Sequence, residues 1–148
     1  GGDVTSHIVQ KLKFEEQIAL DAGAFYTAPG IGPQVFGIFA IPAPGVTLEE
    51  VEARLDAAVA SFVPDAEALA RAQTRIRASQ VYALDRQSSR AQRYGVALSA
   101  GLTLEDIDAW PEVLQSITVE DISAAHASIF DIRRSVTGYL MGPEEVTQ

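Results

Sequence analysis

The chain has 148 residues, a hydrophobic content of 47% and a formal net charge of −9, which together predict one folded domain with a core. The acidic excess and the scattered arginines exclude a nucleic-acid groove, which needs clustered Lys and Arg. No apolar run approaches the roughly 20 residues of a membrane span, and the absence of cysteine excludes disulfides and thiolate chemistry.

The first third of the chain predicts a helix followed by a β-hairpin. Residues 5–16 place apolar side chains at near-helical spacing. Residues 18–26 and 35–41 are typical of strands, and the Pro- and Gly-rich segment 29–33 between them favours an antiparallel hairpin with a loose loop. Each strand contains a glycine, which indicates close packing or a bulge.

The rest of the chain predicts several helices and one last strand. Thr47 stands three residues before Glu50, the pattern of a capping box. The predicted elements are a helix from Thr47 to about residue 62, a helical stretch over 65–100 that breaks near Ser88–Ser89 and stops at Gly101, a helix from Thr103 that ends or bends at Trp110–Pro111, a helix over 118–130 and a strand over 134–141.

This order segregates strands from helices and predicts an α+β fold, with a mainly antiparallel sheet covered on one face by helices. The stretch 65–100 is expected to pack on that face. Three strands make a thin sheet, so we expect the first strands and helix of the domain to lie upstream of Gly1. Residues 1–148 are then a single partial domain, as the Gly-Gly start and the late Met141 also indicate.

Candidate catalytic patterns are absent from the sequence. His7 and His126 lie on predicted helices without a second ligand at the spacing of a zinc helix, which favours structural roles. No Gly-x-Ser-x-Gly elbow accompanies the serines. Glu49, Glu50 and Glu52 fall at the start of a helix, where acidic side chains complement the dipole. We therefore predict no catalytic residue, no metal ligand and no cofactor in this chain.

Several strings, taken in order, resemble one peptidase family. Residues 6–13 are similar to a helix of pattern S-R-L-x-x-x-L-R, and residues 18–20 stand where that family has G-L-A-Y. Residues 84–95 resemble L-D-x-x-x-x-R-A-x-x-x-G, residues 117–122 resemble I-x-x-V-T-x-E-D-V, and Gly142–Pro143 match a closing G-P. The chain thus resembles, over roughly its whole length, the C-terminal (non-zinc) domain of an M16 (pitrilysin, or mitochondrial-processing-peptidase-like) zinc metallopeptidase.

The resemblance implies a LuxS/MPP-like metallohydrolase half and one candidate site residue. In the family, two such domains enclose a chamber, and the other domain carries zinc on an H-x-x-E-H motif that this chain lacks. The C-terminal domain supplies an Arg and a Tyr that hold the substrate, and these positions fall on Lys13 and Leu20. Lysine keeps the positive charge of the arginine but lacks its planar guanidinium group. Leucine, unlike tyrosine, donates no hydrogen bond. Lys13 is therefore the candidate substrate-binding residue, and Leu20 is expected in the core.

The implied function is that of a non-catalytic domain that closes the proteolytic chamber and positions an extended peptide along a sheet edge. The implied partners are a zinc-bearing M16 N-terminal domain or subunit, which would hold the zinc, and a peptide substrate. A homodimer through an exposed sheet edge stays open, and the family suggests a periplasmic location. One alternative is an inactive M16-like interaction or assembly module. The other is a free-standing small-molecule enzyme, which would need a pocket with perturbed titratable groups.

Overall fold

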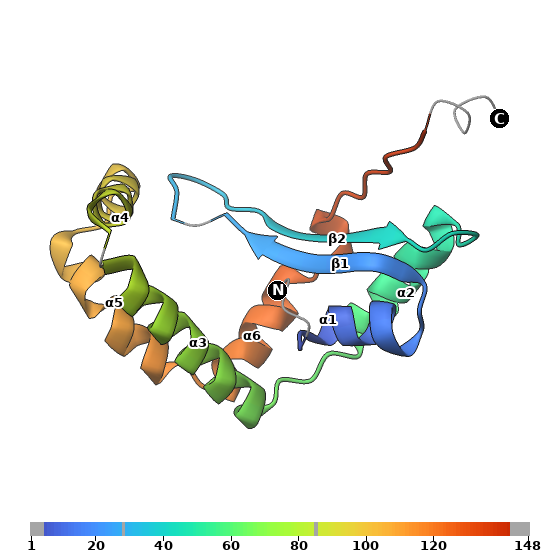
Figure 1. The fold of residues 1–148 in the computed structure, drawn as a ribbon, viewed down its shortest axis with the longest axis horizontal. Helices are drawn as coiled ribbons and strands as arrows, with labels where there is room; N and C mark the ends of the chain where they lie inside the picture. Colours follow the sequence, from blue (N-terminus) through green and yellow to red (C-terminus); the bar gives the residue numbers. More distant parts are fainter. Residues whose placement is uncertain (1–4, 28, 85, 143–148) are drawn as a thin grey trace. The chain divides into compact units, whose positions relative to one another are not determined.

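The computed structural model describes residues 5–27, 29–84 and 86–142. It shows an α+β chain with a two-stranded antiparallel sheet, which confirms the predicted fold class (Figure 1). Its elements are α1 His7–Val9, η1 Gln10–Glu15, β1 Ala19–Tyr26, β2 Phe36–Pro42, α2 Leu48–Ala60, α3 Ala66–Leu84, α4 Gln87–Ser99, α5 Leu104–Ser116, α6 Val119–Ile129 and η2 Ile132–Arg134.

The chain divides into two compact units. The first unit contains residues 1–23, 39–62 and 127–148, and the second contains residues 24–38 and 63–126. The hairpin of β1 and β2 contributes to both units. The single domain predicted for residues 1–148 stays a prediction. The predicted packing of α3 and α4 on the sheet also stays a prediction.

The core of the first unit forms where η1 meets the sheet. The side chain of Leu12 is fully buried against Ala19 and Ala22 of β1. Four partly buried apolar residues complete this cluster, namely Ile8, Ile18, Ala40 and Leu55. Helix α2 packs against both α1 and η1. These helices therefore cover the part of the sheet that belongs to the first unit.

The segment η1 is a π-helix, not the α-helix that the sequence predicts throughout residues 5–16. The amide of Glu16 donates to the carbonyl of Lys11 over 2.9 Å, a bond that spans five residues. The amide of Ile18 then donates to the carbonyl of Leu12 over 3.0 Å, and Gln17 between them has φ of 54°. This wide turn reverses the chain directly into β1.

In the second unit, an aromatic ring explains the glycine of β2. A Cβ atom on Gly37 would lie 2.1 Å from Cζ of Phe25, so the ring occupies the space that any larger residue would need. The rings of Tyr26 and Phe36 lie next to this pair, with centroids 6.4 Å apart. The predicted close packing at Gly37 is confirmed.

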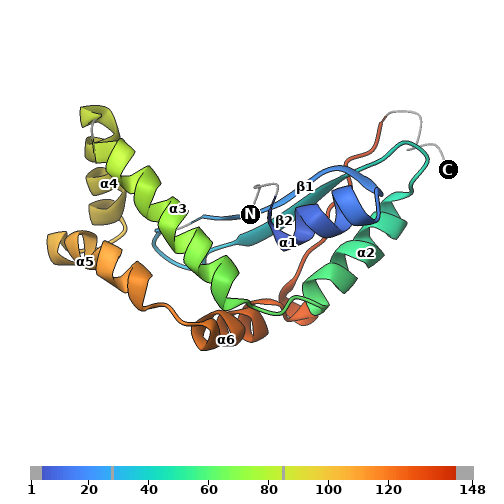
Figure 2. The same cartoon turned by 60° about the horizontal axis from the view of Figure 1, so that its bottom comes forward.

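The rest of the described second unit contains helices α3, α4, α5 and the larger part of α6, with α3 and α5 side by side (Figure 2). The side-chain amide of Gln73 in α3 donates to the carbonyls of Leu114 and Ile117, over 2.9 and 3.2 Å. It thereby satisfies carbonyls at the C-terminal end of α5 that lack helical donors. Gly101, with φ of +89°, ends α4 as predicted.

Two predicted helix boundaries were wrong. The structure places the N-cap of α4 at Arg86, so Ser88 and Ser89 lie inside the helix. Helix α5 continues through Pro111 to Ser116. For α5, Arg93 of α4 supplies a donor to the carbonyl of Ile107, which the proline leaves without its helical partner.

The strand predicted over residues 134–141 was also wrong. Ile132–Arg134 form a short 3-10 helix, capped by the Asp131 side chain that accepts from the amide of Arg133 over 3.1 Å. Residues 135–142 have no regular structure. A strand needs a neighbour for its backbone groups, and among the described residues the sheet has only β1 and β2.

Candidate functional site

Lys13, the predicted substrate-binding residue, lies on η1 and faces β1. Its Nζ atom is 3.8 Å from Oδ1 of Asp21, and the two side chains are 39% and 55% exposed. An ion pair this long and this accessible to water contributes little to stability. The ammonium can therefore exchange Asp21 for the carboxylate or carbonyl of a bound ligand at low cost.

Leu20, in contrast, is not in the core as predicted. Its side chain is 55% exposed. The core residue Leu12 packs on the small side chains of Ala19 and Ala22, which flank this position. Leu20 is thus an exposed apolar side chain of β1, and it precedes Asp21 in the strand.

Sequence reasoning missed Asp21 as the partner of Lys13. The two residues are eight positions apart, on a helix and on the strand that follows it. Only the tight reversal at residues 16–18 brings them together. The sequence did contain one indication of this contact. The connection between the predicted helix and the following strand is short, so the end of the helix has to lie against the start of the strand.

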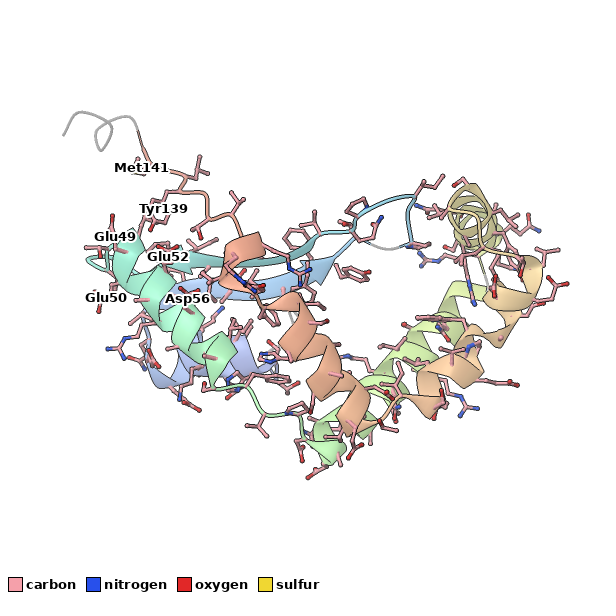
Figure 3. The ribbon with its side chains drawn as sticks, turned by 180° about the vertical axis from the view of Figure 1, so that it is seen from behind. Glu49, Glu50, Glu52, Asp56, Tyr139 and Met141 are labelled. Carbon is pink, nitrogen blue, oxygen red and sulfur yellow. The ribbon has the colours of Figure 1, made fainter. Side chains whose placement is uncertain are left out.

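A second polar cluster lies on α2 (Figure 3). The hydroxyl of Tyr139 donates a hydrogen bond to Oε2 of Glu52, and Figure 3 shows Tyr139 beside Glu49 and Glu52. Hydrogen bonds from Tyr139 and Thr137 lower the pKa of Glu52. The bond to Glu52 raises the pKa of Tyr139 to about 12, and desolvation and the negative charges of Glu49 and Asp56 act in the same direction.

Residues at the start of α2 act as the sequence predicts. Thr47 caps the helix, because its hydroxyl accepts from the amide of Glu50 over 3.2 Å. Glu49 and Glu50 lie in the first turn, where they complement the helix dipole. The contact of Glu52 with Tyr139 joins residues 87 positions apart, and no sequence pattern indicated it.

His7 has a structural role in the first unit. Its Nε2 atom lies 3.0 Å from the carbonyl of Ala58, near the end of α2. Its ring meets that of Phe62 edge-on, with centroids 5.6 Å apart. His7 therefore links α1 to α2. The other histidine, His126, is a partly buried residue of α6 in the second unit.

A shallow pocket of about 470 Å³ lies in the second unit, between α3 and α5. Its lining consists of Arg77, Pro111, Glu112, Gln115 and Ser116. The hydroxyl of Ser116 donates to the carbonyl of Val113 over 2.9 Å. The pocket thus places no activated nucleophile beside a base, and it gives little support to the small-molecule enzyme.

The described residues contain neither a metal-ligand cluster nor a membrane-spanning helix. In residues 5–27, 29–84 and 86–142, no group of three or more His, Asp or Glu side chains is arranged to hold a metal ion. Within the same ranges, no helix combines the length and the apolar character needed to cross a membrane.

No protein-family model and no curated protein matches the chain. Among solved structures, it is similar to a protease from Helicobacter pylori, with a TM-score of 0.77 and 14% sequence identity. The match covers 88% of this chain and 32% of that protease. The chain therefore has the fold found in about one third of that protein's length.

Proposed function

We propose that this chain is the non-catalytic C-terminal domain of an M16-like zinc metallopeptidase. The observation that carries the proposal is the fold shared with one third of the Helicobacter pylori protease. The family-like strings at residues 6–13 and 117–122 support it independently. The domain would close a proteolytic chamber opposite the zinc-bearing domain and position an extended peptide there.

The Lys13–Asp21 pair is the proposed peptide contact. An extended peptide beside β1 would gain backbone hydrogen bonds and one charged contact from Nζ of Lys13. The exposed Leu20 would contact an apolar side chain of the same peptide. These groups bind and orient the substrate, whereas activation of the attacking water belongs to zinc in the partner domain.

The test combines this chain with the zinc-bearing domain encoded in the same or the neighbouring gene, identified by H-x-x-E-H. Hydrolysis of an internally quenched fluorescent peptide should require both components. Lys13→Ala should raise KM several-fold with little change in kcat, because the lysine binds the peptide uniformly. Lys13→Arg should retain a low KM. A zinc-bearing domain that neither associates with this chain nor gains activity from it would contradict the proposal.

Lys11→Ala provides the matched control for that assay. Lys11 lies on the same π-helix and pairs with Glu15, Nζ to Oε2 over 3.4 Å. Its removal costs the helix one charge without touching Asp21. Equal effects of Lys11→Ala and Lys13→Ala would assign the loss to general charge and not to a peptide contact at Lys13.

A second candidate function is an inactive interaction or assembly module. The observation that favours it is Leu20, an exposed apolar side chain at the position where the family resemblance implies a tyrosine. Leucine donates no hydrogen bond to a developing oxyanion. This candidate predicts that the zinc-bearing partner binds the chain tightly without hydrolysing peptides in its presence.

A further inference from the structure

The charged side chains around Lys13 are arranged in pairs. Within residues 5–23 and 39–62 of the first unit, each lysine and arginine lies close to a carboxylate. The distances from nitrogen to oxygen are 3.4 Å for Lys11–Glu15, 3.8 Å for Lys13–Asp21 and 3.8 Å for Arg54–Glu16. The surroundings of Lys13 therefore hold no excess of positive charge that would retain an acidic peptide.

A ligand that carries a single charge gains little at the Lys13–Asp21 pair. A peptide carboxylate that binds the ammonium of Lys13 displaces Asp21, whose own carboxylate then loses its partner. A peptide ammonium that binds Asp21 leaves Lys13 unpaired in the same way. In both cases one exposed ion pair replaces another of similar strength. Affinity rises only when the ligand supplies a partner for both groups.

We infer that the Lys13–Asp21 pair selects peptides that carry one acidic and one basic side chain two residues apart, with the acid on Lys13 and the base on Asp21. The inference rests on the proposed function, in which an extended peptide lies at this pair, and it names the class of that peptide. Side chains at positions i and i+2 of an extended chain point to the same face, roughly 7 Å apart. The flexible side chains of Glu and Lys can then bring their charged ends to two groups that are 3.8 Å apart.

The charge of the whole chain separates this class from peptides of one sign. The chain has 20 acidic and 11 basic residues and a net charge of −9. A purely acidic peptide is repelled by this charge, and a purely basic peptide is attracted to any of the many carboxylates. Binding of a peptide that carries both charges depends instead on a local arrangement of a cation beside an anion, which Lys13 and Asp21 supply.

The test measures the binding of fluorescent peptides to the full chain by anisotropy, without a zinc-bearing domain. The peptides share one length and one set of apolar residues and differ at two positions, as Glu-x-Lys, Lys-x-Glu or Gln-x-Gln. All three have the same net charge. One of the two charged peptides should bind about two- to fivefold more tightly than Gln-x-Gln, the gain from one additional exposed ion pair. Raising the ionic strength from about 0.1 M to about 1 M should remove this gain.

Paired substitutions keep the net charge of the chain constant and assign the preference to these two residues. Lys13→Gln with Asp21→Asn should abolish the preference. Lys13→Asp with Asp21→Lys reverses the polarity of the pair, so the preference should move from one order of charges in the peptide to the other. The control Lys11→Glu with Glu15→Lys reverses the neighbouring pair on the same π-helix and should leave the preference unchanged. Far-UV circular dichroism verifies that each variant is folded.

The outcomes separate this inference from the proposed function. Equal affinity for charged and neutral peptides would overturn the inference but not the proposed function, because the peptides would still bind. A preference that survives Lys13→Gln with Asp21→Asn, or that the reversed pair does not reverse, would overturn it in the same way. A lack of binding by all three peptides would contradict the proposed peptide contact itself.

Discussion

Arg93 of α4 donates a hydrogen bond from Nη2 to the backbone carbonyl of Ile107 in α5, over 2.9 Å. In a regular helix this carbonyl would accept from the amide of residue 111. Pro111 has no amide hydrogen, and Ile107 is only 4% exposed. Helix α5 therefore passes through Pro111 because a neighbouring helix supplies the missing donor.

Arg93→Leu should lower the free energy of unfolding by about 1–3 kcal/mol, because it leaves the buried carbonyl of Ile107 without this donor. In a Pro111→Ala background the helix supplies its own donor, so the same substitution should cost clearly less. Urea unfolding of the four proteins in this double-mutant cycle measures the coupling.

Arg90→Leu is the control for that cycle, since Arg90 is an exposed arginine of the same helix. It should change stability little in either background. Strict additivity of Arg93→Leu and Pro111→Ala would show that Arg93 does not replace the amide that Pro111 lacks.

Two caps should make stability sensitive to acid. Asp106 and Asp121 each accept from the backbone amide and hydroxyl of the threonine three residues earlier. These bonds, the backbone bond first, lower the pKa of both carboxyls below 3.8. A lowered folded-state pKa stabilises the fold above the unfolded value, and this contribution is lost as the pH falls through the folded value.

The double variant Asp106→Asn with Asp121→Asn should consequently show a shallower loss of stability below about pH 4 than the unmodified chain. Urea unfolding at several pH values between 5 and 2 measures this slope. Asp108→Asn removes one carboxylate outside the caps and serves as the control. An unchanged acid slope in the double variant would exclude these caps as its origin.

The caps were predictable from the sequence, whereas the ends of several elements were not. Thr47 can be identified as a cap from a span of four residues, because the interaction is local. The continuation of α5 depends on Arg93, and the state of residues 134–141 depends on whether a neighbouring strand exists. Neither the end of α5 nor the conformation of residues 134–141 can therefore be predicted from the local sequence.

The candidate site divides in the same way. Lys13 was identified as a candidate from its place in one short sequence pattern that resembles the family. Its partner Asp21 required the chain reversal at residues 16–18, and the exposure of Leu20 is seen only in the structure. The Tyr139–Glu52 bond spans 87 positions. Contacts of this kind follow from tertiary structure and not from local pattern.

Tyr139 should lose its phenolic proton at a higher pH than an ordinary tyrosine. The hydrogen bond to Glu52 raises the pKa of Tyr139 from 10.0 to about 12, because the carboxylate favours the neutral phenol. A raised folded-state pKa stabilises the fold fully below the unfolded value, and this contribution is lost as the pH rises from about 10 to about 12. Glu52→Gln should return the tyrosine toward 10.0.

Ultraviolet difference titration of the folded chain measures this effect, with Tyr139→Phe identifying which transition belongs to Tyr139. Glu50→Gln removes a charge from the same helix without removing the acceptor of the tyrosine, and it should leave the late transition in place. Identical titrations for the unmodified chain and Glu52→Gln would contradict the hydrogen bond.

The end of the π-helix supplies the last prediction. Gln17 has φ of 54°, a conformation in which a Cβ atom costs roughly 1–2 kcal/mol. Gln17→Gly removes this cost, but it also adds about 0.5–1 kcal/mol of backbone entropy to the unfolded state. The net result should be a gain of up to about 1 kcal/mol, measurable as a higher urea midpoint. Gln17→Ala keeps a Cβ atom and should bring no gain, so equal midpoints for the two variants would show that the turn is not strained.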